Sequence, residues 1–112
     1  MSKTKIEDID KKKLSKEDLE IFEKFEKAAE DVKGLPKPPS TDEKLSLYGL
    51  FKQALDGKNT TTRPGLLDFE GKAKYDAWFK HGDMTKQDAQ KKYVDLVAEL
   101  DKKYKPTATT SK

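Results

Sequence analysis

Three side chains between residues 48 and 52 show the clearest potential for chemistry. Tyr48, Phe51 and Lys52 stand at positions i, i+3 and i+4, a spacing that places them on one face of a helix. Two aromatic rings beside an ammonium group suit a ligand that has a flat base and a phosphate. A packed core needs such rings but not the lysine, although each residue taken singly also fits a structural role, as a core aromatic or a solvated lysine.

Two further segments extend this pattern. The sequence Thr-Arg-Pro-Gly stands at 62–65 in the following loop, and Lys-Ala-Lys-Tyr-Asp-Ala-Trp stands at 72–78. In this order and at these separations, and with Tyr93 on a later helix, the motifs resemble the acyl-CoA-binding protein family. The resemblance runs from about Phe25 to Tyr104. It implies an all-α fold, a four-helix up-down bundle, here with an N-terminal extension.

The resemblance also implies where a ligand binds. In the family, a YxxYK motif on the second helix meets the adenine and the adenosine 3′-phosphate, and Phe51 stands where the family usually has the second tyrosine. Matching lysines lie near the phosphates on the first and third helices, and a matching tyrosine on the fourth helix contacts the nucleotide. The implied acyl-CoA-binding residues are Lys33, Tyr48, Phe51, Lys52, Lys74 and Tyr93.

Other positions near these motifs receive different interpretations. Pro38 occupies a position that is basic in the family, with Lys37 beside it, and Tyr75 replaces a common tryptophan while keeping an aromatic ring. We assign Trp78 to the core. His81, the only histidine, stands near a predicted helix end, where a favourable interaction with the helix terminus is expected.

The elements that must position these residues are helices separated by glycine and proline. Apolar residues recur at steps of three and four in the first and fourth helices, and the second carries more apolar residues than one core-facing stripe requires. The second helix is therefore expected to have two apolar faces, one for the core and one for a ligand. The predicted helices run from about Ser15 to Gly34, Ser40 to Asp56, Glu70 to His81 and Thr85 to Tyr104.

The chain divides into three predicted regions. Residues 1–22 form an N-terminal extension that is partly helical, 23–105 form the acyl-CoA-binding domain, and 106–112 form a flexible tail. We expect the chain from Met1 to Leu14 to be mobile and at least part of 15–25 to be helix packed on the bundle. Because the implied ligand contacts all lie from Lys33 onward, the extension is expected to be dispensable for binding.

Composition excludes several classes of function. The 112 residues carry a net charge of only +3, and Arg63 is the single arginine among 24 basic residues, which argues against nucleic acid as a main partner. There are no cysteines and one histidine, so thiolate metal sites and cysteine–histidine catalysis are not expected. No apolar run approaches the ~20 residues that span a bilayer, so stable membrane insertion is not expected.

The combined interpretation is a binding protein rather than an enzyme. The resemblance implies a monomeric, cytoplasmic carrier of long-chain acyl-CoA, with acyl-CoA-using enzymes as candidate partners and no cofactor beyond the fatty acyl-CoA ligand. An enzymatic alternative is disfavoured because the chain leaves no room for a second, catalytic domain. The remaining alternative is a helical interaction module that docks on a protein or a membrane surface.

Overall fold

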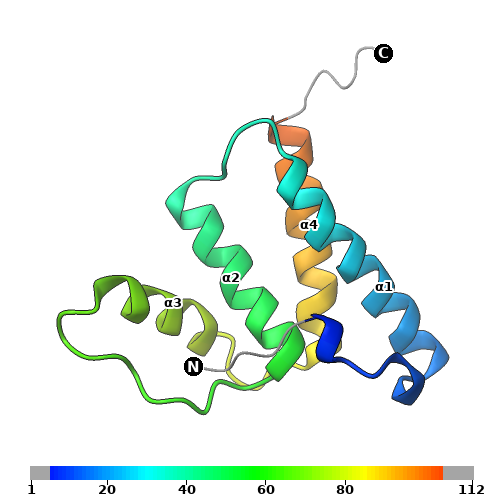
Figure 1. Cartoon of the computed structure of the whole chain (residues 1–112), viewed down its shortest axis with the longest axis horizontal. Helices are drawn as coiled ribbons and strands as arrows, with labels where there is room; N and C mark the ends of the chain where they lie inside the picture. The colour runs from blue at the N-terminus through cyan, green and yellow to red at the C-terminus, as the bar shows by residue number, and fades with distance from the viewer. Residues whose placement is uncertain (1–5, 105–112) are drawn as a thin grey trace.

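The computed structural model describes residues 6–104, and in this range the protein is helical and contains no strand (Figure 1). The predicted all-α fold class is therefore confirmed. Three short 3-10 turns accompany the α-helices: η1 (Ile6–Asp8), η2 (Lys11–Lys13) and η3 (Val32–Gly34). The α-helices are α1 (Lys16–Asp31), α2 (Thr41–Asp56), α3 (Phe69–Phe79) and α4 (Lys86–Tyr104).

The three long helices form the body of the bundle. In Figure 1, α1 and α4 run in the same direction, α2 runs in the opposite direction, and α3 lies across α2 on the side away from α1. Helix α4 contacts both α1 and α2, whereas α3 packs on α2. Each long helix therefore has a neighbour that covers its apolar face. No helix in the described part of the chain is long and apolar enough to cross a membrane.

Side chains at the helix starts satisfy backbone groups that have no partner within the helix. The Ser15 hydroxyl accepts a hydrogen bond from the Asp18 amide, and Ser40 and Glu43 form a complete capping box on α2. Thr85 accepts from the Asp88 amide at 3.1 Å. These starts agree with the sequence analysis, since the predicted caps at 15, 40 and 85 all make their hydrogen bonds.

Two of the predicted helices require corrected boundaries. Helix α3 begins at Phe69, because Asp68 accepts from the Gly71 amide and acts as its cap, and it ends at Phe79 rather than at His81. The chain then turns through Gly82, whose φ of 56° lies in the left-handed region that glycine adopts without strain. The first α-helix ends at Asp31 and is followed by the 3-10 turn η3. The prolines at 36, 38 and 39 then prevent a helix from continuing.

The core lies between α1, α2 and α4. Large aromatic side chains from α1 meet aliphatic and aromatic residues of α2 and α4, and alanines allow the helices to approach one another. Helix α3 is anchored separately by Trp78, whose side chain is 1% exposed. Its assignment to the core was correct. The buried cluster consists of Phe22, Phe25, Ala28, Ala29, Leu47, Leu50, Ala54, Leu55, Ala89, Tyr93, Val97 and Leu100.

The described part of the N-terminal extension contains two short helical turns before α1. Residues 6–14 form η1 and η2, and Ile6, Ile9 and Leu14 pack against the core cluster. The mobility predicted up to Leu14 stays a prediction, although these apolar side chains lie at the edge of the bundle. The predicted helix over 15–25 does pack on the bundle, with Phe22 buried. Residues 1–5 and the predicted tail at 106–112 lie outside the described residues.

Glu43 joins the start of α2 to the end of α4. One carboxylate oxygen accepts from the Tyr104 hydroxyl at 2.6 Å and from the Ser40 amide at 2.8 Å, and the other lies 2.6 Å from the Lys103 ammonium group. These bonds, with that from Lys103 first, lower the pKa of Glu43 from 4.5 to about 2. The ionised carboxylate is therefore the form that the fold favours.

This depressed pKa predicts an acid-dependent loss of stability. The contribution of Glu43 is complete above pH 4.5, the ordinary value, and is lost as the pH falls towards the folded-state pKa of about 2. In Glu43→Gln the amide still serves the capping box but carries no charge. We expect the difference in urea midpoint between the parent and Glu43→Gln to shrink as the pH is lowered through this window. A difference that stays constant across it would contradict the assigned role.

Candidate functional site

A close approach of α2 to α3 positions half of the candidate site. Gly49 faces the backbone of α3, and a Cβ atom at this position would collide with the carbonyl of Ala77. The Trp78 indole N–H donates to the Gly57 carbonyl oxygen at 2.8 Å, which fixes α3 against the end of α2. Side chains that project from α2 and α3 on the same side of this contact are therefore held close together.

Lys52 lies inside this contact. Its side chain is 7% exposed, its ammonium group is 3.2 Å from an Asp56 carboxylate oxygen, and it stands 5.4 Å from the centre of the Trp78 ring. The interpretation of Lys52 as a solvated surface lysine is therefore wrong. A cation over an aromatic face and beside a carboxylate is stabilised in a partly dry environment, so this residue is a structural part of the α2–α3 contact.

Tyr48 and Lys74 face each other across the same two helices. The Lys74 ammonium group lies 5.7 Å from the centre of the Tyr48 ring and 3.8 Å from a Glu70 carboxylate oxygen. Partial burial, and to a lesser extent the charge of Asp56, raises the pKa of the Tyr48 hydroxyl, so it stays protonated at neutral pH. The pair offers a ligand an aromatic face, a hydroxyl and a half-buried cation.

Phe51 and Tyr93 lie on the other side of α2. Their ring centres are 5.9 Å apart, and each ring also contacts Phe25, at 5.5 Å for Phe51 and 5.1 Å for Tyr93. Tyr93 is 4% exposed, and burial raises the pKa of its hydroxyl to about 12. Both rings also line a cavity, so the aromatic cluster serves the core on one side and an open space on the other.

This cavity has a volume of about 530 Å³, which is in the range of small-molecule sites. Its apolar wall includes Phe51 and Tyr93, and its charged residues include three glutamates and one lysine. The lysine is Lys33, which is exposed and lies 3.4 Å from Glu30. The lining residues are Ile6, Glu7, Glu26, Ala29, Glu30, Val32, Lys33, Phe51 and Tyr93.

The structure thus divides the six expected ligand residues into two groups. Lys33, Phe51 and Tyr93 line the cavity, while Tyr48, Lys52 and Lys74 lie at the α2–α3 contact. The groups meet along α2, because residues 48 and 51 are one turn apart. Tyr48, Phe51 and Lys52 were expected to share one face, but Phe51 contacts Tyr93 of α4 whereas Lys52 lies over Trp78 of α3.

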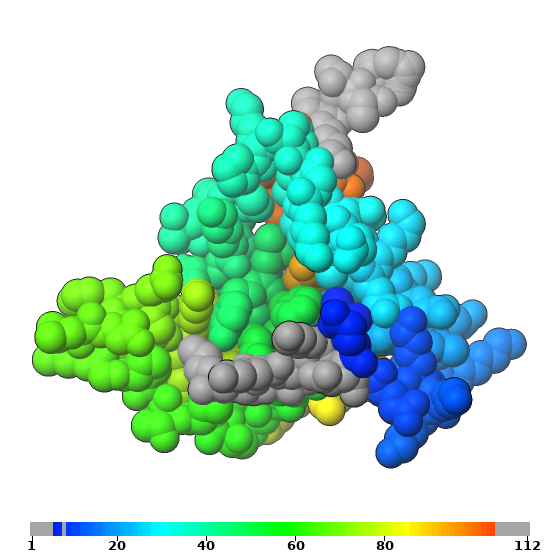
Figure 2. Space-filling model, viewed as in Figure 1, coloured from blue at the N-terminus to red at the C-terminus, as the bar shows by residue number. Residues whose placement is uncertain are grey.

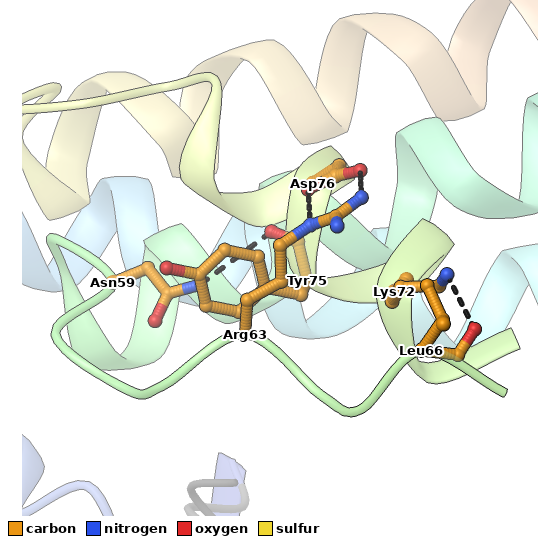
Figure 3. Close-up of polar contacts among 6 residues, drawn as sticks. All are labelled: Asn59, Arg63, Leu66, Lys72, Tyr75 and Asp76. Carbon is orange, nitrogen blue, oxygen red and sulfur yellow. Dashed lines mark hydrogen bonds and ion pairs between the residues drawn. The ribbon is translucent and has the colours of Figure 1, made fainter. Parts of the chain in front are cut away.

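The loop between α2 and α3 is held by polar contacts that sequence reasoning did not identify (Figure 3). The Arg63 guanidinium donates two hydrogen bonds to Asp76, at 3.0 and 2.8 Å, and Lys72 donates to the Leu66 carbonyl oxygen at 2.7 Å. Asn59, which is 4% exposed, accepts from the Thr61 amide. Arg63 of the loop and Lys72 of α3 therefore hold the loop on α3.

His81 lies just beyond the end of α3 at Phe79. Burial, followed by the charges of Lys80 and Lys92, lowers the pKa of its imidazole. The neutral form is therefore favoured, and the expected interaction with the helix terminus stays a prediction. Among the described residues there is no group of three or more His, Asp or Glu side chains arranged to hold a metal ion.

The residues that sequence reasoning missed are those on the N-terminal side of the cavity. Ile6 and Glu7 line it, although the extension was expected to have no part in the site. A signal was present in the sequence, because Ile6 and Ile9 are spaced by three in an otherwise charged segment. Ala29 and Val32 belonged to the apolar stripe that we assigned to the core, and they also face the cavity.

Comparison with known proteins gives concordant matches. The family model described as "Acyl CoA binding protein" matches residues 22–97. An acyl-CoA-binding protein homolog of Drosophila melanogaster is 51% identical over 84 residues, covering 75% of this chain and 98% of the relative. A Caenorhabditis elegans homolog is 54% identical over 80 residues, covering 71% and 93%. The match to rat enoyl-CoA delta isomerase 2 is 49% identical but covers only 19% of that protein.

Solved structures agree with the sequence matches. The crystal structure of Oryza sativa acyl-CoA-binding protein 2 superposes with a TM-score of 0.72 at 39% identity, covering 76% of this chain and 92% of that chain. The crystal structure of ACBP from Moniliophthora perniciosa gives a TM-score of 0.68 at 46% identity, covering 73% and 81%. The family match over 22–97, with relatives about half identical, shows that this chain belongs to the acyl-CoA-binding protein family.

Proposed function

We propose that this protein binds long-chain fatty acyl-CoA and carries it in the cytoplasm as a monomer, without transforming it. The observation that supports this most directly is the convergence along α2 of a lysine–tyrosine pair and an aromatic cavity. One side offers charge and a hydroxyl for phosphates, and the other offers ring faces for a base. Membership in the family makes acyl-CoA the ligand that unites both requirements.

The nucleotide end of the ligand is assigned to the residues around α2. Lys74 is half-buried, and its ion-pair partner Glu70 is exposed and 3.8 Å away, so its ammonium group is free to exchange this contact for a phosphate. Charge-assisted hydrogen bonds of that kind stabilise binding by about 1.5–3 kcal/mol each. Phe51 and Tyr93 supply aromatic surface for the adenine, and the hydroxyl that Phe51 lacks is not needed for such packing.

The acyl chain supplies most of the binding free energy in this proposal. Each buried methylene contributes up to about 0.8 kcal/mol, so ten of them contribute about 8 kcal/mol before ordering costs. The chain length therefore decides affinity, and the nucleotide decides which molecules are recognised. A carrier of this kind supplies the enzymes that consume acyl-CoA, which are its candidate partners.

A calorimetric titration of the full chain with three ligands tests the proposal. We expect hexadecanoyl-CoA to bind far more tightly than free CoA or free hexadecanoate, because only the ester combines the nucleotide contacts with burial of an acyl chain. Similar affinity for the ester and the free fatty acid would contradict recognition of the nucleotide. Binding of none of the three would favour the alternative of an interaction module.

Lys74→Ala is a sharper test of the nucleotide end than a substitution at Lys52. Lys52 is buried beside Asp56, so removing it would also lower stability by leaving that carboxylate without its ammonium neighbour. Removing the Lys74 ammonium group is expected to weaken hexadecanoyl-CoA binding by about 1.5–3 kcal/mol, roughly ten-fold or more in Kd.

The matched control for this test is Lys72→Ala. Lys72 belongs to the same motif on α3, but its ammonium group donates to the Leu66 carbonyl oxygen and lies over the Phe69 ring. Its loss removes the same charge from the same helix and should leave Kd nearly unchanged. Equal weakening by the two substitutions would mean that net charge, rather than a contact made by Lys74, determines the effect.

A further inference from the structure

We propose that residues 6–14 cover the ligand cavity and that acyl-CoA binding displaces them, so that the extension restrains binding. This inference rests on the proposed function and assigns a regulatory role to a segment outside the region that the family model matches, residues 22–97. It is carried by three properties of the segment: where it lies, how it is attached and which charge it brings.

The first property is location. Ile6 and Glu7 form one side of the cavity whose other sides include Lys33, Phe51 and Tyr93. Figure 2 shows the start of the blue segment between α1 in cyan and α2 in green, on the face that these helices share. A ligand that packs its base on Phe51 and Tyr93 must therefore either share the cavity with Ile6 or move it.

The second property is weak attachment. Ile6, Ile9 and Leu14 are only partly buried against the core, and the segment contains two isolated 3-10 turns of three residues each. Its one ion pair to the body of the protein, among the described residues, joins Lys11 to Glu26 at 2.7 Å. Exposed ion pairs of this kind stabilise little, and ordering nine backbone residues opposes docking. The segment is therefore held firmly enough to dock and weakly enough to be displaced.

The third property is charge. Glu7 adds a carboxylate to a cavity that already contains Glu26 and Glu30. The two nearby lysines are occupied, since Lys33 lies 3.4 Å from Glu30 and Lys11 lies 2.7 Å from Glu26. A phosphate that approaches Lys33 while the segment is docked meets three carboxylates, which repel it. Departure of the segment removes Glu7 from the cavity but also takes Lys11 away from Glu26, so the competition rests mainly on the space that Ile6 and Glu7 occupy.

These properties make the extension a competitor of the ligand. When a binding-competent state is only partly populated, the apparent affinity falls in proportion to its population. Substitutions that undock the segment should therefore tighten acyl-CoA binding. In the opposite arrangement Ile6 closes over a bound base, and undocking the segment would then weaken acyl-CoA binding. The direction in which the affinity changes therefore distinguishes displacement from closure.

The test compares Lys11→Glu with Lys12→Glu in the full chain. Lys11→Glu places a carboxylate against Glu26 and close to Glu23, whose charge also acts on Lys11, and so should release the segment. Lys12 lies on the same 3-10 turn, and its side chain is exposed and makes no ion pair within the described residues. Both substitutions change the net charge equally, so long-range repulsion of the anionic ligand is the same in both.

We expect Lys11→Glu to bind hexadecanoyl-CoA about three-fold or more tightly than Lys12→Glu in calorimetry at low salt. Equal or weaker binding by Lys11→Glu, with the parent protein still binding, would overturn this inference while leaving the proposed function in place. Failure of the parent and both variants to bind would overturn the proposed function and this inference with it.

Amide hydrogen exchange on the unmodified chain gives an independent readout. Addition of hexadecanoyl-CoA should speed exchange in residues 6–14, because the ligand displaces them, while slowing exchange in α2 and α4 around the cavity. Slower exchange in residues 6–14 on ligand addition would show that the segment closes over the ligand, and would overturn the proposed competition.

Discussion

The contact on which the rest of the structure depends is the aromatic cluster of Phe25, Phe51 and Tyr93. One ring comes from each of α1, α2 and α4, and their centres are 5.1–5.9 Å apart. Tilted and edge-to-face pairs at such distances are favourable beyond the area they bury. Because two of these rings, Phe51 and Tyr93, also line the cavity, a substitution that disturbs the packing of the three helices also reshapes the candidate site.

A second constraint is the burial of Lys52 against Trp78 and Asp56, which neutralises its charge within the protein. A phosphate reaches this ammonium group only by competing with an existing partner. Lys74 lies further from its carboxylate partner and is more exposed, so it can change partners at a lower cost. The two lysines are therefore unequal in their surroundings: Lys52 is buried at the contact between α2 and α3, and Lys74 is half-exposed, which is why we propose Lys74 as the better test of phosphate binding.

The features that could be predicted from the sequence are those that local chemistry determines. Helix starts followed from Ser15, Ser40 and Thr85, because a cap depends on its own side chain and the next three residues. The end of α3 was misplaced, since Gly82 marks the stop in the sequence while the turn that leads to it begins directly after Phe79. Family membership could also be predicted, because the motifs at 48–52, 62–65 and 72–78 keep their order and spacing although phenylalanine replaces tyrosine at 51.

What could not be predicted depends on contacts between distant segments. Periodicity assigned Tyr48, Phe51 and Lys52 to one face, but which neighbour each side chain meets is decided by the crossing of α2 with α3 and α4. The burial of Lys52 and the docking of Ile6 are of the same kind. Lys52 meets Trp78, 26 residues away in the sequence, and Ile6 packs on a core cluster that begins at Phe22, so no local pattern encodes either contact.

The central claim is that one ligand site runs along α2 from the Tyr48–Lys74 pair to the Phe51–Tyr93 rings. Intermolecular nuclear Overhauser effects in the complex with hexadecanoyl-CoA test it most directly. The account predicts contacts from the adenine protons to the rings of Phe51 and Tyr93. Well-resolved adenine contacts that involve neither ring and map instead to another face of the bundle would contradict it.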